Sequence, residues 1–339
     1  MIASHPYRSQ IATVPAGGSR PLWSVMIPTY NCANYLQETL TSVLAQDPGR
    51  ELMQIEVVDD CSTQDDPEAI VKGLAGDRVS FYRQPQNVGH IQNFDTCLQR
   101  SHGRLIHLLH GDDLVMPGFY NKLQTGFDQH PEIGAAFSRH VFIDELSNWT
   151  KLSDLEQTHS GILTNWLEKI AVRQLIQTPS IVVRREVYER WGGFDRRMKC
   201  WGEDWEMWVR IAAQYPVWYE SQPLAQYRQR STSLTGNTIR TGENIQDIRQ
   251  AIEIVKEYLP ASTAASLNRN ALQNYANYAL STADSFIKAK DRTAAIAQIR
   301  AAIACHFSLS TIPMLLKLSL KAVNREISSK LALARSTNL

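Results

Sequence analysis

The sequence shows no pairing pattern among its cysteines and no excess of charge of either sign. Five cysteines are scattered over 339 residues without a C-x-x-C motif, which argues against a disulfide framework and a zinc site and favours a reducing compartment. Lys and Arg together number 35 and Asp and Glu 34, so the chain offers no broad basic field to nucleic acid. We therefore expect a cytoplasmic protein with no nucleic-acid partner.

Long apolar runs and glycine-rich nucleotide motifs are also missing. No segment approaches the roughly 20 apolar residues of a membrane span, so any contact with a membrane would be peripheral. A G-x-G-x-x-G after the first expected strand and a G-x-x-x-x-G-K-[ST] motif are both absent, which disfavours Rossmann dinucleotide enzymes and P-loop enzymes. Residues 1–20 lack a continuous apolar core, and we expect a flexible leader rather than a secretory signal there.

From residue 21 onward, short apolar strands alternate with amphipathic helices. Because the strands are apolar on both faces, the alternation predicts a parallel sheet covered by helices, with ligands bound at the carboxyl ends of the strands. The expected strands are 22–28, 54–60, 79–83 and 104–110, followed less regularly by strands near 135–137, 180–183 and 224–227. The expected helices are 33–46, one opening at Pro67, 90–100, 164–171, 185–191 and 203–214.

Near residue 238 the composition shifts toward Ala, Leu, Gln and Lys, with helical periodicity throughout. We expect three parts: the leader at 1–20, a catalytic α/β domain at 21–237 and an all-helical region at 238–339. The final helix, 311–336, has an apolar stripe with basic residues beside it. Such a helix can lie on an anionic membrane, although packing on the catalytic domain is the favoured alternative.

Polar residues follow each of the first four expected strands. Because parallel strands end at one edge of a sheet, these residues should line one crevice. Taken singly each is weak, since Asn31 or Ser62 can simply cap a helix. The four segments are Pro28-Thr29-Tyr30-Asn31, Asp59-Asp60-Cys61-Ser62, Asn87-Val88-Gly89 and Gly111-Asp112-Asp113.

The adjacent carboxylates Asp112 and Asp113 are the most informative pair. Two like charges at the end of an apolar strand repel each other with little water to screen them. A divalent cation would remove the conflict, and Mg²⁺ or Mn²⁺ held by one or two carboxylates usually completes its shell with phosphates and water. The alternative is a solvated turn before Pro117 with Asp as a helix cap.

Five segments in this order resemble the inverting nucleotide-sugar glycosyltransferases of family 2. They are SVMIPTYNCANYLQETLTSVLAQ, IEVVDDCSTQD, NVGHIQNFDTCLQRSHGRLIHLLHGDD, GEDWEMWVRI and AQYRQRSTS, spanning roughly residues 21 to 233. The resemblance implies a GT-A fold, an α/β class with a Rossmann-like mixed sheet flanked by helices, here with the appended helical region. It also implies a divalent cofactor, Mn²⁺ or Mg²⁺.

The resemblance implies a role for each matching residue. Asp204 of the GED segment would be the catalytic base, and Asp112 and Asp113 would bind the metal and the ribose. Pro28, Tyr30 and Asp60 would hold the nucleoside, with Asp59 in support. The complete set expected at the nucleotide sugar is Pro28, Thr29, Tyr30, Asp59, Asp60, Asn87, Gly89, Asn93, Asp112, Asp113, Arg228 and Arg230.

Two positions depart from the family pattern. His110 stands where members often carry a further acid, which makes Asp112 the principal metal ligand. Arg230 stands where a histidine is frequent. Arg228 and Arg230 can grip a diphosphate, or they can be surface arginines beside acidic neighbours.

Opposing effects act on Asp204. In the first turn of a helix it faces the positive end of the macrodipole, which favours the charged form. The tryptophans nearby, Trp201 and Trp205, can desolvate it and raise its pKa toward that of a working base. The sequence does not decide between these effects.

The resulting hypothesis is an inverting transferase. It would move a sugar from a nucleoside-diphosphate sugar, favoured as a UDP-sugar, to a hydroxyl of a glycan or lipid-linked acceptor in cell-surface polysaccharide or cell-wall biosynthesis. Such an enzyme would work in the cytoplasm, with peripheral contact on the inner face of the plasma membrane through the last helix as an open alternative. The rival hypothesis is a nucleotide-sugar binding module without turnover, part of a larger assembly.

Overall fold

The structure is a computed structural model that describes residues 5–15, 19–230, 234–307 and the single positions 313 and 318. The expected helix at 311–336 therefore lies almost entirely outside the described residues. The chain divides into two compact units. Unit 1 comprises Met1–Ile170, Gln174–Arg197 and Glu203–Arg230, and unit 2 comprises Ala171–Arg173, Met198–Gly202 and Ser231–Leu339.

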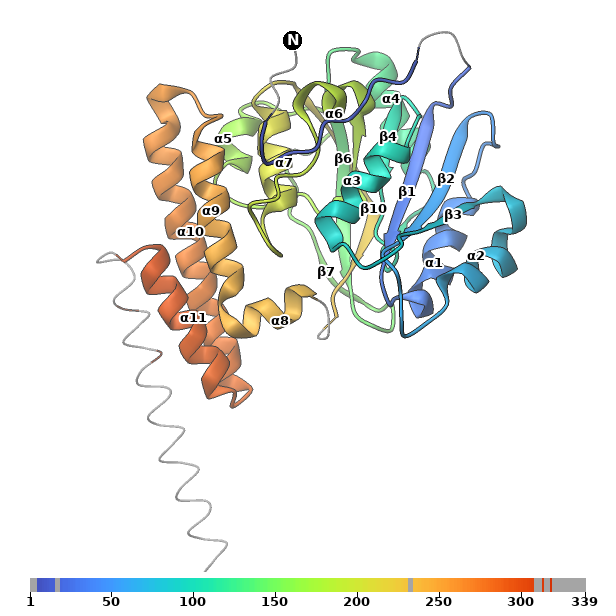
Figure 1. The fold of residues 1–339 in the computed structure, drawn as a ribbon. Helices are drawn as coiled ribbons and strands as arrows, with labels where there is room; N and C mark the ends of the chain where they lie inside the picture. Colours follow the sequence, from blue (N-terminus) through green and yellow to red (C-terminus); the bar gives the residue numbers. More distant parts are fainter. Residues whose placement is uncertain (1–4, 16–18, 231–233, 308–312, 314–317, 319–339) are drawn as a thin grey trace, which may run out of the picture. The chain divides into compact units, whose positions relative to one another are not determined.

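Unit 1 is built on a mixed sheet in the order β3-β2-β1-β4-β9-β6-β10-β5, with β7 beside β6 and β8 beside β10 (Figure 1). Strands β1, β2, β3 and β4 are parallel, whereas β9 runs antiparallel to both β4 and β6. The strands are β1 (Trp23–Thr29), β2 (Met53–Asp59), β3 (Ser80–Arg83), β4 (Leu105–Leu108), β5 (Leu114–Val115), β6 (Ala135–Ile143), β7 (Trp149–Leu152), β8 (Gly161–Ile162), β9 (Ile181–Arg184) and β10 (Val217–Arg228).

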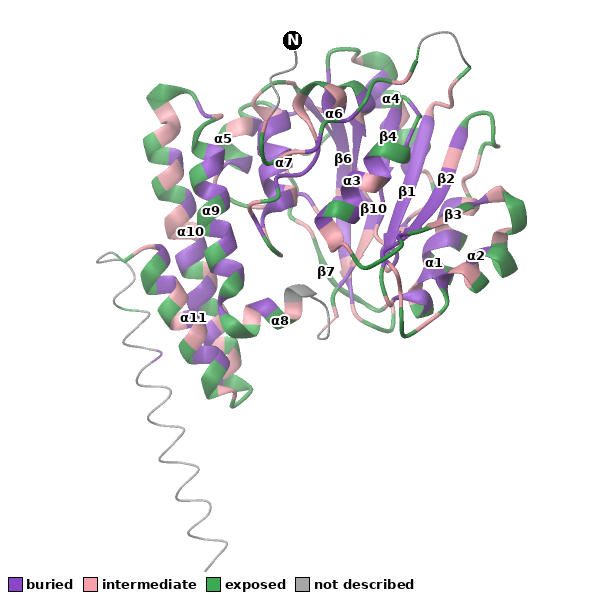
Figure 2. Ribbon diagram, in the orientation of Figure 1, coloured by how far each residue is buried: buried purple, intermediate pink, exposed green. Residues whose placement is uncertain are grey.

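Helices cover both faces of this sheet, as the apolar strands predict. Every residue of β1 and β4 is buried (Figure 2). Alternate residues of β1 face opposite ways, so Trp23, Val25 and Ile27 share a core with Leu36 and Leu40. The helices of unit 1 are α1 (Ala33–Leu44), α2 (Pro67–Ala75), α3 (His90–Arg100), α4 (Phe119–Gln129), α5 (Trp166–Ile170), α6 (Arg185–Trp191) and α7 (Glu203–Ala212), with short 3-10 turns at Gly76–Arg78 and Thr178–Ser180.

Most expected elements of unit 1 are confirmed, and the differences lie at their ends. The strand expected near 224–227 is the second half of the twelve-residue β10, which is interrupted by register shifts around Pro223. The apolar pattern of β10 is interrupted at the same place, so the periodicity of the sequence predicts only the second part of the strand. The sheet combines parallel and antiparallel pairs, as the family resemblance implies. The parallel sheet predicted from the apolar strands is correct for β1 to β4 and wrong for β9, which runs antiparallel to both its neighbours.

Residues 7–12 differ from the flexible leader expected for residues 1–20. The Ser9 carbonyl accepts a hydrogen bond from the Gly193 N–H (2.9 Å), and Ile11 is buried. Arg8 forms ion pairs with Asp195 (3.4 Å) and with Glu206 (3.2 Å) of α7. These contacts are backbone hydrogen bonds and ion pairs to distant residues, and they leave no periodic pattern in the sequence.

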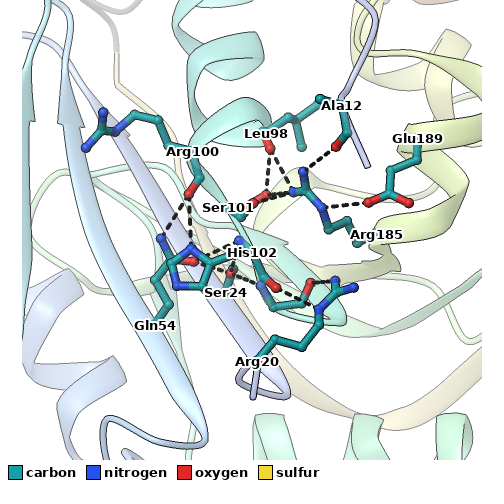
Figure 3. Close-up of polar contacts among 11 residues, drawn as sticks. Ala12, Arg20, Ser24, Gln54, Leu98, Arg100, Ser101, His102, Arg185 and Glu189 are labelled. Carbon is teal, nitrogen blue, oxygen red and sulfur yellow. Dashed lines mark hydrogen bonds and ion pairs between the residues drawn. The ribbon is translucent and has the colours of Figure 1, made fainter. Parts of the chain in front are cut away.

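A second buried arginine joins three segments of unit 1. Arg185, the first residue of α6, donates hydrogen bonds to the carbonyls of Leu98 (3.0 Å), Ser101 (2.5 Å) and Ala12 (3.0 Å) and to the Glu189 carboxylate (2.9 Å) (Figure 3). The end of α3, the start of α6 and the N-terminal segment are thereby linked. A guanidinium suits this position because it presents five donors in a fixed plane.

Unit 2 is helical, with α8 (Leu234–Thr241), α9 (Glu243–Lys256), α10 (Ala261–Lys288) and α11 (Arg292–Cys305). The buried side of α10 is rich in small residues, including Ala271, Ala276 and Ala279, which allows its neighbours α9 and α11 to approach closely. Asp247 of α9 accepts the N–H groups of Lys199 (3.2 Å), Cys200 (2.8 Å) and Trp201 (3.2 Å) within the same unit. Among the helices described here, none is long and apolar enough to cross a membrane.

We expect Arg185→Ala to lower the free energy of unfolding by about 3 kcal/mol, because it leaves buried carbonyls and Glu189 without their donor. Urea unfolding followed by circular dichroism measures the change. Arg190→Ala, which removes an exposed arginine of the same helix, is the matched control and should cost less than about 1 kcal/mol. Equal losses in the two variants would contradict the role of Arg185.

Candidate active site

The loops after β1 and β2 are tied together by short polar side chains. Asn31 has a left-handed backbone (φ 48°), and its Oδ1 accepts the N–H groups of Thr63 (2.9 Å) and Gln64 (3.1 Å). Ser62 Oγ accepts the Asn31 N–H (2.9 Å) and donates to Asp59 (2.5 Å). Asn31 and Ser62 thus join the two loops instead of capping α1, whose first N–H, that of Ala33, donates to Asp65 Oδ2 (2.7 Å).

Two of the expected binding residues serve mainly to hold the backbone at this edge. Asp59 is fully buried and also accepts a hydrogen bond from Arg83 Nε (2.7 Å), and a supporting role at the nucleoside stays a prediction. Asn93 of α3 is buried and donates to the Val58 carbonyl (2.9 Å). Both side chains are buried, so neither offers polar atoms to a ligand in this structure.

Asp60 joins the end of β2 to the loop before α3. Its carboxylate accepts the N–H groups of Val88 (2.8 Å) and Gly89 (2.9 Å), and its own N–H donates to the Thr29 carbonyl (2.9 Å). Burial raises the pKa of Asp60, against the lowering effect of the two N–H donors. The structure therefore brings Thr29, Asp60 and Gly89 together, with Asn87 donating to the Asp60 carbonyl (3.2 Å).

The end of β4 reaches the same place. The Gly111 N–H donates to the Pro28 carbonyl (3.0 Å). A Cβ atom at Gly111 would lie 3.0 Å from Cys32 Sγ and 3.1 Å from Thr29 Cβ, so the close approach of the two loops favours glycine there. Tyr30 is 46% exposed beside these loops, free to meet a ligand.

Asp112 and Asp113 avoid their mutual repulsion by taking different partners. Asp112 is partly exposed and pairs with Arg230 Nη2 (2.7 Å). Asp113 is buried, its Oδ1 accepts the Arg228 N–H (2.8 Å), and its Oδ2 lies 3.5 Å from His110 Nδ1. Burial raises the pKa of Asp113 to about 6, with His110 lowering it and Asp112 raising it further.

Two arginines lie at the end of β10, Arg228 as its last residue and Arg230 just after it, and they differ in how far their side chains are exposed. The Arg228 side chain is fully buried and donates to the Asp112 carbonyl (2.8 Å), Ser147 Oγ (2.9 Å) and the Glu38 carboxylate (2.9 Å). Arg230 lies partly exposed on Asp112. In this arrangement Arg230 is the better placed to meet a diphosphate, and a phosphate role for either residue stays a prediction.

Asp204 lies in the first turn of α7, and its two oxygens have separate donors. Oδ1 accepts the Trp205 N–H (2.7 Å), and Oδ2 accepts Gln174 Nε2 (2.7 Å). Burial raises the pKa of Asp204 to about 7 and the neighbouring Glu203 charge adds to this, while the Trp205 N–H and His110 act in the opposite direction. Desolvation therefore outweighs the helix terminus, which the sequence left undecided.

His110 lies between the two groups of acids. Its ring stacks on Phe94 with centroids 5.1 Å apart and planes 13° from parallel. Burial by itself lowers the pKa of His110, but the contact with Asp113 and the charges of Asp112 and Asp204 raise it overall. The histidine that replaces a further acid thus adds positive charge where three carboxylates gather.

Sequence reasoning missed three residues of this site: Glu38, His90 and Gln174. Glu38 holds Arg228, His90 lies 3.3 Å from Glu203 Oε1, and Gln174 holds Asp204. Each partner lies at least 30 positions away along the chain. Only His90 carried a local signal, since it opens α3 directly after the Asn-Val-Gly segment.

The carboxylates of Asp112 and Asp113 fit a hard divalent cation. No cluster of three or more His, Cys, Asp or Glu side chains that could hold a metal occurs in the described part of the chain. The buried Asp113 Oδ2 accepts no hydrogen bond from the described residues, although it carries lone pairs that need a partner. Two carboxylates suit an ion whose remaining ligands come from a diphosphate and water.

Comparison with known proteins places this geometry in a family. A family model described as Glycosyl transferase family 2 matches residues 24–192. The uncharacterized protein MT1568 of Mycobacterium tuberculosis is 30% identical over 254 residues, which cover 71% of this chain and 77% of that protein. The putative teichuronic acid biosynthesis glycosyltransferase TuaG of Bacillus subtilis is 24% identical over 250 residues, covering 69% of this chain and 89% of TuaG.

Solved structures share the fold. Residues 1–349 of S. aureus TarS match with a TM-score of 0.61 and 15% identity, covering 89% of this chain and 88% of that one. TarS has also been solved in complex with UDP-GlcNAc. The mannosyltransferase PcManGT of Pyrobaculum calidifontis, in complex with GDP-Man and Mn²⁺, matches with a TM-score of 0.57 and 19% identity, covering 92% of this chain and 83% of that one.

The mixed sheet, the paired carboxylates after β4 and these matches together define the fold class of the GT-A glycosyltransferases. The chain belongs to glycosyltransferase family 2, has the GT-A fold and is a glycosyltransferase. The family match ends at residue 192 and does not include Asp204, so the match itself gives no role to this residue.

We expect Asp60→Asn to loosen the loop before α3, because an amide offers one acceptor oxygen where the carboxylate serves both the Val88 and the Gly89 N–H. Hydrogen exchange measured by mass spectrometry should rise about tenfold or more in a peptide spanning 85–92, as expected for about 1.4 kcal/mol of lost protection. Asp77→Asn, at an exposed acid, is the control. Unchanged exchange in Asp60→Asn would show that the loop is held by other contacts.

Proposed function

We propose that this glycosyltransferase is an inverting enzyme that uses a nucleoside-diphosphate sugar, favoured as a UDP-sugar, and transfers the sugar to a hydroxyl of a glycan or lipid-linked acceptor. The observation that carries the proposal is the half-buried Asp204, held by Gln174 and the Trp205 N–H, whose pKa of about 7 suits a general base at neutral pH. The carboxylate pair Asp112 and Asp113 supports it from the loop after β4.

The donor would lie along the carboxyl edge of β1, β2 and β4. Pro28, Tyr30 and Asp60 would contact the nucleoside, because they surround the junction of the first two loops and Tyr30 is half exposed there. Thr29, Asn87 and Gly89 belong to the same junction. The TarS complex with UDP-GlcNAc supports a uridine nucleotide, whereas the PcManGT complex with GDP-Man makes guanosine the alternative to test.

In the proposed reaction, Asp204 accepts the proton of the acceptor hydroxyl as its oxygen attacks the anomeric carbon. The bond from that carbon to the diphosphate breaks on the opposite face, so a single displacement inverts the configuration. Gln174 would hold the Asp204 carboxylate in position, since it donates to Oδ2. A divalent ion bound by Asp112 and Asp113 supplies positive charge that stabilises the departing diphosphate, and Arg230 would add a protein cation there.

The acceptor and the place of action form part of the proposal. The name of TuaG supports a role in cell-surface polysaccharide or cell-wall biosynthesis. The five cysteines form no disulfide in the described part of the chain, which supports a reducing cytoplasm. Peripheral membrane contact through residues 311–336, and a catalytic domain bounded at 21 and 237, remain predictions from the sequence.

Metal-dependent release of nucleoside diphosphate from a panel of UDP- and GDP-sugars tests the function. We expect wild-type protein with Mn²⁺ or Mg²⁺ to turn over one donor, and Asp204→Asn to bind that donor normally while its kcat falls at least about 100-fold. Wild-type activity should rise with pH through about 7, because the base must be deprotonated. Donor binding without turnover in the wild-type protein, tested with a range of acceptors, would instead favour a binding module.

Asp112→Ala tests the metal site. We expect the Mn²⁺ concentration for half-maximal activity to rise at least about tenfold, because a direct carboxylate ligand is lost. Isothermal titration with Mn²⁺ and the nucleoside diphosphate gives a second readout that does not depend on turnover. Asp128→Ala, on the exposed side of α4, is the control. Unaltered metal dependence in Asp112→Ala would overturn the assignment of this residue as the principal ligand.

A further inference from the structure

Glu203 is a buried acid for which the proposed reaction has no task. It directly precedes Asp204 in the first turn of α7 and is 8% exposed. Its Oε1 lies 3.3 Å from His90 Nε2, and its Oε2 is buried without a hydrogen-bond donor among the described residues. Burying a carboxylate with one unpaired oxygen is unfavourable. The presence of Glu203 beside the candidate base therefore needs a physical explanation.

His90 is held in place from two sides. Its ring contacts Phe94 edge to face, with centroids 5.5 Å apart. It follows Gly89, whose left-handed backbone (φ 85°) and N–H are fixed by Asp60. The position of the histidine beside Glu203 is therefore determined by the loop that also carries the expected nucleoside contacts.

Charged and titratable groups reach this acid pair from several elements. His110, with Asp113 and Asp112 behind it, faces both acids from the loop after β4, and Asp60 faces His90 from the end of β2. Tyr227 approaches from β10, and burial together with the surrounding acids raises its pKa, so it stays neutral. Gln174 and the Trp205 N–H are neutral donors to Asp204.

Two adjacent carboxylates in a buried site do not both ionise readily at neutral pH, so one holds the charge and the other retains its proton longer. His90 is the basic side chain in contact with Glu203, whereas Asp204 has neutral donors. The pKa of Glu203 is lowered, since the contact with His90 and the His90 charge outweigh the effect of burial. The ionised Glu203 then raises the pKa of Asp204.

We propose that His90 and Glu203 form a charge pair, 3.3 Å apart, that assigns the role of base to Asp204: Glu203 is paired with the histidine, and Asp204 is left with neutral donors and free to accept the proton. Both are positioning residues, because they act through Asp204 and not on the reacting atoms. The inference rests on the proposed function, since it requires Asp204 to be the base.

The pH dependence of kcat, measured from pH 5 to 9 with saturating donor and metal, tests the proposal. In Glu203→Gln the acid limb should move down by about one pH unit, because removing a neighbouring negative charge favours the ionised form of Asp204. In His90→Gln the limb should move up by about half a unit or more, because a positive charge is lost. A role in packing alone would lower the rate without moving the limb in opposite directions.

Glu186→Gln and His159→Gln are the matched controls, since both residues are exposed and lie outside the site, and their acid limbs should coincide with that of the wild type. His90 is partly exposed, so its variant decides the question by itself if Glu203→Gln fails to fold. Limbs that stay in place or move in the same direction in the two site variants would overturn the charge-pair proposal.

Asp204→Asn separates this inference from the function on which it rests. Retained turnover in Asp204→Asn would overturn both the base assignment and the charge pair. Lost turnover in Asp204→Asn, together with an unmoved acid limb in Glu203→Gln and His90→Gln, would leave the proposed function intact and overturn the charge pair alone. Opposite movements of the two limbs, with Asp204→Asn inactive, would support both.

Discussion

The gathering of acids at one edge of the sheet is the constraint on which the rest of the site depends. Asp60, Asp112, Asp113, Glu203 and Asp204 all belong to this region; Asp60, Asp113 and Glu203 are buried, and the other two are half-buried. Burying like charges together is unfavourable unless each finds a partner. The structure provides backbone N–H groups for Asp60, Arg230 for Asp112, and histidines for Asp113 and Glu203.

These partners also connect the loops that form the site. Asp60 fixes the loop before α3, and that loop places His90 beside Glu203. Arg228 joins the Asp112 carbonyl to α1 through Glu38 and to the β6–β7 connection through Ser147. The same contacts thus neutralise the acids and fix the loops. A change in the charge of one acid is therefore expected to move the loops that form the proposed donor site.

The buried part of the site is accordingly polar and held in place by hydrogen bonds, and the more exposed side chains lie at its surface. Asp59 and Asn93 are consumed by the backbone, whereas Tyr30, Asp112 and Arg230 keep exposed surface for a ligand. The list of residues expected to touch the donor therefore divides into groups that can reach it directly and groups that hold the first set in place. Asp112 and Arg230 at the surface of this edge, with Asp113 buried behind them, suit a diphosphate and its cation.

The sequence by itself determined the α/β class, the strands β1, β2 and β4, and the acids at the ends of β2 and β4, because buried strands are continuous apolar runs and the chain direction places their carboxyl ends together. It did not determine which acid carries a proton. Asp204 could be read as a helix-terminal charge or as a desolvated base, and the choice depends on Gln174, Glu203, His90 and His110, which the fold brings together from separate segments. Periodicity reports only local geometry, whereas burial and charge at a point depend on every segment packed around it, so only the tertiary structure decided the electrostatics of the site.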